Sequence, residues 1–168
     1  GALHREHASV SALPKMMMDR AAGLLIEREL GFLGELAGGA PSPYIAIVGG
    51  AKITGKIEVL ETLLEAVDGL IIGGAMANTF LAAQGHEMGG SLVEADRIPL
   101  ARHLLKRFAD KSVPVWLPVD VVCAESVEDG AATHVERVGT LGPSQKAVDI
   151  GPETTALFNS VLDGSLEG

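Results

Sequence analysis

Hydrophobic and polar positions form two alternating patterns along the chain. Short, mainly apolar runs have the length of buried strands; they cover residues 44–48, 70–72, 115–117, 119–123 and 147–150. Between them, apolar residues recur three or four positions apart, which predicts amphipathic helices; these cover residues 14–37, 56–66, 76–83, 94–111 and 152–162. The polar segment 125–146 carries no clear pattern and has no predicted element.

Glycine pairs follow the first two predicted strands, as Gly49-Gly50 and Gly73-Gly74. Alternating strands and helices are typical of an α/β fold with a doubly wound parallel sheet, Rossmann-like and three-layered. Such sheets bind ligands outside the carboxyl ends of their strands. Both glycine pairs are therefore expected at the ligand-binding edge. Glycines and prolines separate the helix over 14–37 from the sheet, so it is a candidate link between two domains.

Composition limits the classes of partner. The 168 residues include 13 Lys and Arg against 22 Asp and Glu, a formal net charge of −9, which disfavours general nucleic-acid binding. A local phosphate site needs only a few cations and stays possible. The single cysteine, Cys123, excludes an internal disulfide and is expected to be a buried structural thiol in a reducing compartment.

The ends and the apolar segments of the chain favour a cytoplasmic protein without a membrane partner. No apolar run approaches the roughly 18–20 residues of a membrane span, and the start lacks the apolar region of a secretory signal. The chain also begins without Met, so we expect a piece of a longer protein.

The strongest functional signal lies between the first predicted strand and the helix that follows it. Gly49 and Gly50 allow a ligand to approach the backbone, and a helix start offers free amides to an anion. Lys52 and Lys56 bracket that helix start, where cations are unfavourable unless an anion lies between them. A phosphate is the natural guest. A tight turn with two solvated lysines remains the alternative.

The same segment comes close to a P-loop. The spacing from Gly50 to Gly55 and Lys56 fits, but Ile57 stands where a P-loop needs Ser or Thr to hold magnesium. A P-loop-like ATPase is therefore an alternative function. At the second pair, Gly73 and Gly74 would admit a flat base or sugar, or would serve only close helix–strand packing.

Two further segments carry candidate chemistry. Arg5, between His4 and His7, suits bidentate recognition of phosphate or carboxylate. The two histidines lack a nearby third ligand, so no metal site is predicted, and a polar chain terminus is the alternative. Residues 149–152 again place a glycine and a helix start after a strand, either as a third wall of the cleft or as a simple turn.

Several of these segments occur in a characteristic order. They are residues 4–9, 49–52 with Lys56, 70–81, 83–86, 117–120 and 149–152. In this order and spacing the chain resembles the phosphoglycerate kinase family, and specifically the middle of its sequence. The resemblance implies the end of an N-terminal domain over 1–13, an interdomain helix over 14–38, and an incomplete nucleotide-binding domain over 39–168.

The resemblance also implies an activity, which is reversible phosphoryl transfer between ATP and 3-phosphoglycerate in glycolysis. Magnesium would be held by the nucleotide and by family segments beyond Gly168, the parent enzyme would be a monomer, and this piece alone would not turn over. A non-catalytic nucleotide-binding fragment is the alternative. The implied roles are catalysis by Lys52; nucleotide binding by Lys56, Gly50, Ala51, Gly73 and Gly74; and 3-phosphoglycerate binding by Arg5, His4 and His7. Two departures from the family pattern, Ala75 and Ala147, stand where glycines are common near the nucleotide.

Overall fold

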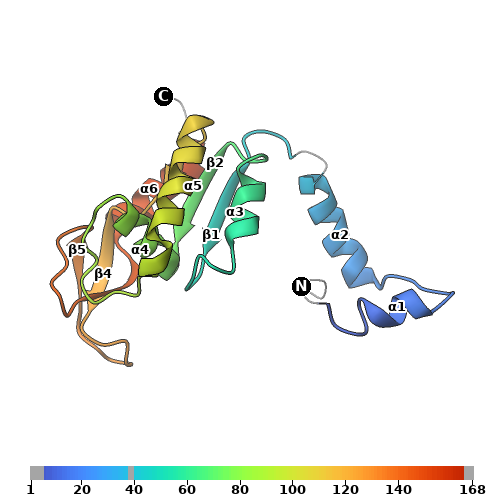
Figure 1. The fold of residues 1–168 in the computed structure, drawn as a ribbon, viewed down its shortest axis with the longest axis horizontal. Helices are drawn as coiled ribbons and strands as arrows, with labels where there is room; N and C mark the ends of the chain where they lie inside the picture. The colour runs from blue at the N-terminus through green and yellow to red at the C-terminus, as the bar shows by residue number, and fades with distance from the viewer. Residues whose placement is uncertain (1–5, 38–39, 165–168) are drawn as a thin grey trace. The chain divides into compact units, whose positions relative to one another are not determined.

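The computed structural model describes residues 6–37 and 40–164, in two compact units, Gly1–Pro41 and Ser42–Gly168 (Figure 1). The first unit contains α1 (Ala12–Met16) and α2 (Leu24–Ala37). The second contains, in chain order, β1 (Ile45–Gly49), α3 (Ile57–Leu63), β2 (Gly69–Gly73), α4 (Gly74–Ala83), the 3-10 turn η1 (Ala95–Arg97), α5 (Ile98–Asp110), β3 (Val115–Trp116), β4 (Asp120–Ala124), β5 (Thr133–Arg137), β6 (Lys146–Ile150) and α6 (Pro152–Leu162).

The prediction of one helix over 14–37 is wrong in its first part. Helix α1 ends at Met16, Met17 is extended, and α2 begins only at Leu24. The guanidinium of Arg20 donates to the carbonyl of Pro14 over 3.1 Å, within this break. The Met18 side chain is 99% exposed, so the methionines gain little from packing, which is the main source of helix stability in proteins.

Strands β1, β2 and β3 form a parallel sheet in that order, as the alternation of strands and helices predicts. The register pairs Ile45 with Gly69 and Gly49 with Gly73, so both glycine-ended strands stop at the same edge. Strand β2 is apolar and buried along Leu70, Ile71 and Ile72 because it lies between the other two strands.

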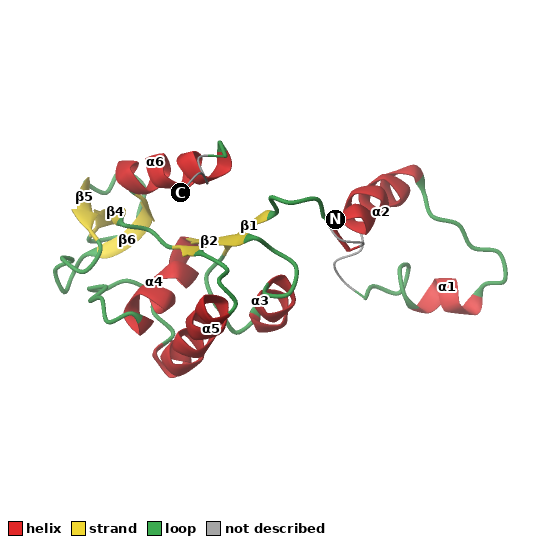
Figure 2. Cartoon of the chain, turned by 90° about the horizontal axis from the view of Figure 1, so that it is seen from above, coloured by secondary structure: helices red, strands yellow, loops and turns green. Residues whose placement is uncertain are grey.

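Helices α3, α4 and α5 lie on one side of β1 and β2, and α6 lies on the other (Figure 2). The core between the sheet and the three helices is built from apolar side chains with almost no exposed surface, which include Leu60, Ile72, Met76, Phe80, Leu104 and Phe108. The amphipathic periodicity of the sequence therefore predicts the buried helix faces correctly. Helix α3 is shorter than the predicted 56–66, and η1 replaces the first turn of the predicted helix 94–111.

The start of β2 packs tightly against the tryptophan of β3. A Cβ added to Gly69 would lie 2.4 Å from an edge carbon of the Trp116 ring, closer than real atoms approach. Only glycine at this position leaves room for the indole beside the sheet. The same added atom would also lie 2.9 Å from the Ile45 side chain of β1. Side chains of β1 and β3 therefore both pack against Gly69 of β2.

The last three strands form a separate antiparallel sheet in the order β5-β4-β6, so the prediction of one parallel sheet does not hold for them. Parallel neighbours need a long crossover, whereas β4 is followed by a turn back into β5, inside the unassigned segment 125–146. Cys123 on the central strand is fully buried, as predicted; burial, with a smaller effect of the Glu136 charge, raises the pKa of its thiol.

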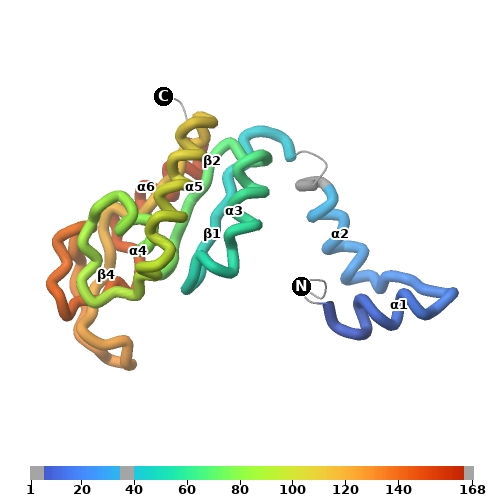
Figure 3. The backbone as a smooth tube through the Cα atoms, viewed as in Figure 1, coloured from blue at the N-terminus to red at the C-terminus, as the bar shows by residue number. Residues whose placement is uncertain are grey.

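The loop after α4 runs beside the loop before β6 (Figure 3). The amide of Gly90 donates to the carbonyl of Gln145 over 2.8 Å, and the amide of Ala147 donates to the Ser91 hydroxyl over 2.9 Å. These bonds join the antiparallel sheet and the loop before β6 to the loop that follows α4. No helix in the described part of the chain combines the length and apolarity that crossing a membrane requires.

Candidate functional site

The two glycine turns lie against each other. The amide of Met76, in the first turn of α4, donates to the carbonyl of Gly50 over 2.8 Å. Gly74 has a φ of +65°, and a Cβ there would lie 3.0 Å from the backbone nitrogen and oxygen of Gly50. The structure thus brings Gly50, Ala51, Gly73 and Gly74 together at the carboxyl edge of the parallel sheet, where ligands of such sheets bind.

Lys52 and Lys56 project from the loop that begins at the first turn. Both side chains are exposed, and Lys56 is the last residue before α3. Among the described residues, neither ammonium lies within ion-pair distance of a carboxylate. Two exposed cations without an ion-pair contact in the described chain, beside a glycine turn, favour an anionic ligand. Ile57 opens α3, so this helix start lacks the hydroxyl of a P-loop.

The Glu94 side chain binds part of the backbone before α3, which the sequence analysis expected to be free for an anion. Its carboxylate accepts hydrogen bonds from the Ile53 amide at 2.5 Å and the Thr54 hydroxyl at 2.8 Å. Partial burial disfavours the charged form, but these bonds, a further one from the Thr54 amide and the charge of Lys52 together lower the pKa of Glu94. The carboxylate is therefore ionised near neutral pH, and the amides before α3 are not all free.

The start of α6 is closed in the same way, by Asp120 of β4. Its buried carboxylate accepts the amides of Glu153 at 3.0 Å and Thr154 at 2.7 Å, and the Thr154 hydroxyl at 2.7 Å. Burial raises the pKa of Asp120, but these bonds outweigh it and the net pKa lies below its usual value. A Cβ on Gly151 would lie 2.3 Å from this carboxylate. The helix start at 151–152 is thus capped by a side chain of β4 and has a structural role.

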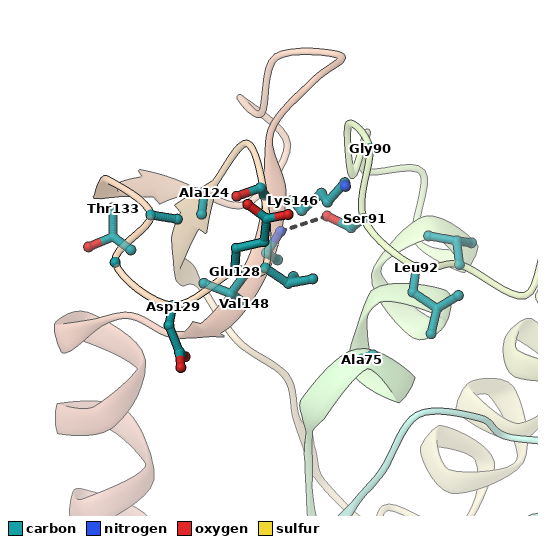
Figure 4. Close-up of a pocket in the computed structure, with 16 residues that line it drawn as sticks. Ala75, Gly90, Ser91, Leu92, Ala124, Glu128, Asp129, Thr133, Lys146 and Val148 are labelled. Atoms are coloured by element: carbon teal, nitrogen blue, oxygen red, sulfur yellow. Dashed lines mark hydrogen bonds between the residues drawn. The ribbon is translucent and has the colours of Figure 1, made fainter.

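A cavity of about 910 Å³ opens beside the start of α4 (Figure 4). Ala75 and Leu92 lie on one wall, and Val148 and Glu128 lie on the other. The lining is mostly apolar with a few charged groups, which suits a flat organic ring with a polar edge. The remaining lining residues are Gly90, Ser91, Val93, Ala124, Ser126, Val127, Asp129, Gly130, Ala131, Thr133, Lys146 and Ala147.

Two smaller cavities lie between the second glycine turn and residues 149–150. One of about 120 Å³ is lined by Gly74, Ala75, Asn78 and Asp149 among others, and one of about 340 Å³ by Gly73, Gly74 and Ile150 among others. Residues 149 and 150 therefore share cavity walls with the second glycine turn, although the helix start after them is occupied by Asp120.

The N-terminal candidates belong to the first unit, Gly1–Pro41. His4 and Arg5 lie outside the described residues, and His7 is exposed in the first unit. In the part of the chain that the structure describes, no group of three or more His, Cys, Asp or Glu side chains is arranged to hold a metal ion.

Comparison with known proteins identifies the family of this chain. The family model described as "Phosphoglycerate kinase" matches residues 1–166. The chain belongs to the phosphoglycerate kinase family. It is 46% identical over 165 residues to the phosphoglycerate kinase of Roseiflexus castenholzii and 43% identical over 162 residues to that of Bdellovibrio bacteriovorus, covering 98% and 96% of this chain.

A solved phosphoglycerate kinase has the same fold. The structure of the Coxiella burnetii enzyme matches 84% of this chain with a TM-score of 0.80 and 37% identity. The chain spans 42% and 40% of the length of the Roseiflexus and Bdellovibrio kinases, and 36% of the Coxiella chain. The chain therefore spans less than half the length of each of these three kinases.

The sequence analysis missed several site residues. Leu92 and Val127 line the large cavity, as do Ala75 and Ala147, which the sequence analysis named only as expected departures from the family pattern near the nucleotide. Glu94 and Asp120 hold the two helix starts. No local pattern distinguishes these acidic residues from solvated ones, because each acts on a segment about 30 to 40 positions away in sequence.

Proposed function

We propose that the chain supplies the central part of a phosphoglycerate kinase, which transfers a phosphoryl group reversibly between ATP and 3-phosphoglycerate. The observation that carries this proposal is the contact between the two glycine turns, through the bond from Met76 to Gly50. It supports a single binding edge with Lys52 and Lys56 on one side and the large cavity beside Ala75 on the other.

The nucleotide would lie along this edge. The large cavity would take the base and sugar, with Gly73 and Gly74 as part of the wall beside them. The phosphates would extend toward Gly50, Ala51 and Lys56, where the glycine backbone permits close approach and the ammonium offsets charge. The apolar lining on one side and unpaired cations on the other support this direction of binding.

Lys52 would act on the group being transferred. A carboxylate oxygen of 3-phosphoglycerate attacks the terminal phosphorus of ATP, the bond from that phosphorus to the bridging oxygen breaks, and ADP leaves. Negative charge spreads over the transferring oxygens, so a fixed ammonium beside them lowers the barrier. No side chain of the protein needs to form a covalent bond in this reaction.

Magnesium would come with the nucleotide. The groups at the edge are ammonium ions and backbone amides, which suit phosphate oxygens, whereas Mg²⁺ takes oxygen ligands. The described residues offer no cluster of acidic side chains for the ion. The side chains at this edge thus fit the phosphates and not the metal, and we assign them no role in holding it.

The other parts of the proposal rest on the family. Arg5, with His4 and His7, would bind 3-phosphoglycerate; residues 1–13 would end an N-terminal domain, 14–38 would link the domains, and 39–168 would belong to the nucleotide-binding domain. We also propose a monomeric cytoplasmic enzyme that acts on small molecules, not on nucleic acid or membranes. The acidic chain with one buried cysteine supports that setting.

The test is Lys52→Ala in a chimeric kinase, in which residues 1–166 of this chain replace the matching segment of the Roseiflexus castenholzii protein. Removing the ammonium should lower kcat by about 100-fold or more, because it removes an interaction made in the transition state. Lys106→Ala is the matched control, since Lys106 is an exposed lysine on α5 that pairs with Asp110. A change of less than about twofold for Lys52→Ala would reject its catalytic role.

A further inference from the structure

The loop that carries Lys52 is tied to the rest of the domain at both ends. At its start, the carbonyl of Gly50 accepts the Met76 amide over 2.8 Å. At its end, the Glu94 carboxylate accepts the Ile53 amide over 2.5 Å with one oxygen and the Thr54 hydroxyl over 2.8 Å with the other. Lys52 lies directly before Ile53 and Thr54, the two residues that Glu94 binds.

Glu94 is itself fixed on α4. Its amide donates to the Thr79 hydroxyl over 3.1 Å, and the neighbouring Asn78 amide group donates to the carbonyl of Leu92 over 3.3 Å. Thr79 is 1% exposed and Asn78 is 4% exposed, so both anchors sit in the rigid core of the domain. Both ends of the Lys52 loop are therefore attached to α4: the start directly through Met76, and the end through Glu94 and Thr79. Helix α4 starts at the second glycine turn.

We propose that Glu94 is a positioning residue for the phosphoryl transfer: its carboxylate fixes the loop at Ile53 and Thr54, so that the Lys52 ammonium is held where the transferring group arrives. This inference rests on the proposed function. Glu94 acts through the backbone and the hydroxyl that it binds, not by contact with the reacting atoms. A preorganised charge is worth more to a reaction than one that must first be ordered.

Hydrogen bonding and charge make different demands on a substitution here. Glu94→Gln keeps an oxygen that accepts the Ile53 amide, and its NH₂ group is able to donate to the Thr54 hydroxyl oxygen, so at least two of the three bonds remain, but the negative charge near Lys52 is lost. Glu94→Ala removes both the bonds and the charge. If positioning is the role of Glu94, the glutamine variant should keep most of the activity that the alanine variant loses.

The main experiment measures kcat, KM for ATP and the folded fraction of the chimeric kinase with Glu94→Ala and Glu94→Gln. For Glu94→Ala we expect kcat per folded molecule to fall at least about tenfold while KM changes by less than about threefold, because the loop positions a group that acts in the transition state. Glu94→Gln should lie within about threefold of the parent. Glu58→Gln and Glu58→Ala are the controls, because Glu58 is an exposed carboxylate in the first turn of the nearby α3.

A second experiment does not depend on turnover. Amide hydrogen exchange is measured on the 168-residue chain, and Glu94→Ala should raise exchange at Ile53 and Thr54 at least about tenfold, with amides of β2 unchanged. An inactive parent chimera would count against the proposed function, and exchange at Ile53 and Thr54 would then decide the role of Glu94.

Three results would overturn the inference. The first is Glu94→Ala with unchanged kcat per folded molecule, whether or not it lowers stability. The second is an equal loss for Glu94→Gln and Glu94→Ala, which would assign the effect to charge. The third is unchanged exchange at Ile53 and Thr54 in the alanine variant.

Discussion

The starts of α4 and α6 share a sequence pattern but have different surroundings. Each helix follows a strand and a glycine, and neither has a capping side chain from the preceding residue. At α6 the buried Asp120 carboxylate accepts two backbone amides and a hydroxyl. At α4 the Met76 amide donates to the backbone carbonyl of Gly50 in the first glycine turn. No carboxylate of the described chain caps this helix start.

The difference teaches what makes a helix start available to a ligand. Unpaired amides attract any anion, and a protein carboxylate serves as well as a phosphate. Where the fold delivers an aspartate, as at Gly151, the helix start becomes part of the core. At α4 no carboxylate of the described chain caps the helix and the second glycine turn lies against the first, so this helix start stays open at the surface. The following predictions test this contrast.

The largest effect is expected from Asp120→Ala. The change leaves the Glu153 and Thr154 amides without their buried acceptor, at a cost of about 3 kcal/mol in the free energy of unfolding. The Thr154 hydroxyl keeps the main-chain carbonyl of residue 120, at 2.8 Å, as its acceptor. Urea-induced unfolding measures it. Asp149→Ala is the control, because its exposed carboxylate accepts only the adjacent Ile150 amide among the described residues. A loss below about 1 kcal/mol for Asp120→Ala would remove the contrast between the two helix starts.

A medium effect is expected from alanine at the second glycine turn. Gly74→Ala places a Cβ 3.0 Å from the Gly50 backbone at a φ of +65°, so it should cost about 1–2 kcal/mol and push the two turns apart. Gly73→Ala is the matched comparison, because its backbone is extended and nothing lies within 4 Å of an added Cβ. Thermal or urea unfolding of both variants gives the difference, and equal stabilities would show that the turns are not in tight contact.

The smallest effect concerns pH. Because the pKa of folded Asp120 lies below its ordinary value of 3.8, its contribution to stability is complete above that value and is lost as pH falls through the lower, folded pKa. The stability difference between the parent and Asp120→Asn should therefore shrink below about pH 4, by at most about 1.4 kcal/mol per pH unit. A difference that stays constant down to pH 2 would mean that Asp120 is not held ionised by the start of α6.

The sequence predicts well what depends on local periodicity. Continuous apolar runs identify β1 and β2, and apolar spacing identifies the buried faces of α3, α4 and α5. The partnership of the two glycine turns also follows from local pattern, because parallel strands end at a common edge. The break between α1 and α2 was missed because periodicity alone does not reveal that Met16 and Met18 lack packing partners.

The parts that could not be predicted depend on contacts between distant segments. The antiparallel pairing of β4 with β5 and β6 requires knowing where 125–146 turns back, and that segment has little apolar pattern. Glu94 and Asp120 are single acidic residues whose partners lie far along the chain. The occupied state of a helix start is therefore a tertiary property, although its position is a local one.

The tight seat of Trp116 on Gly69 has a practical consequence. Because the chain contains a single tryptophan, its intrinsic ultraviolet emission comes almost entirely from the place where β1, β2 and β3 meet. Fraying of the antiparallel sheet should leave that emission nearly constant, whereas separation of the parallel strands should shift it to longer wavelength. Trp116 is thus an intrinsic fluorescence probe for the parallel sheet and not for the antiparallel one.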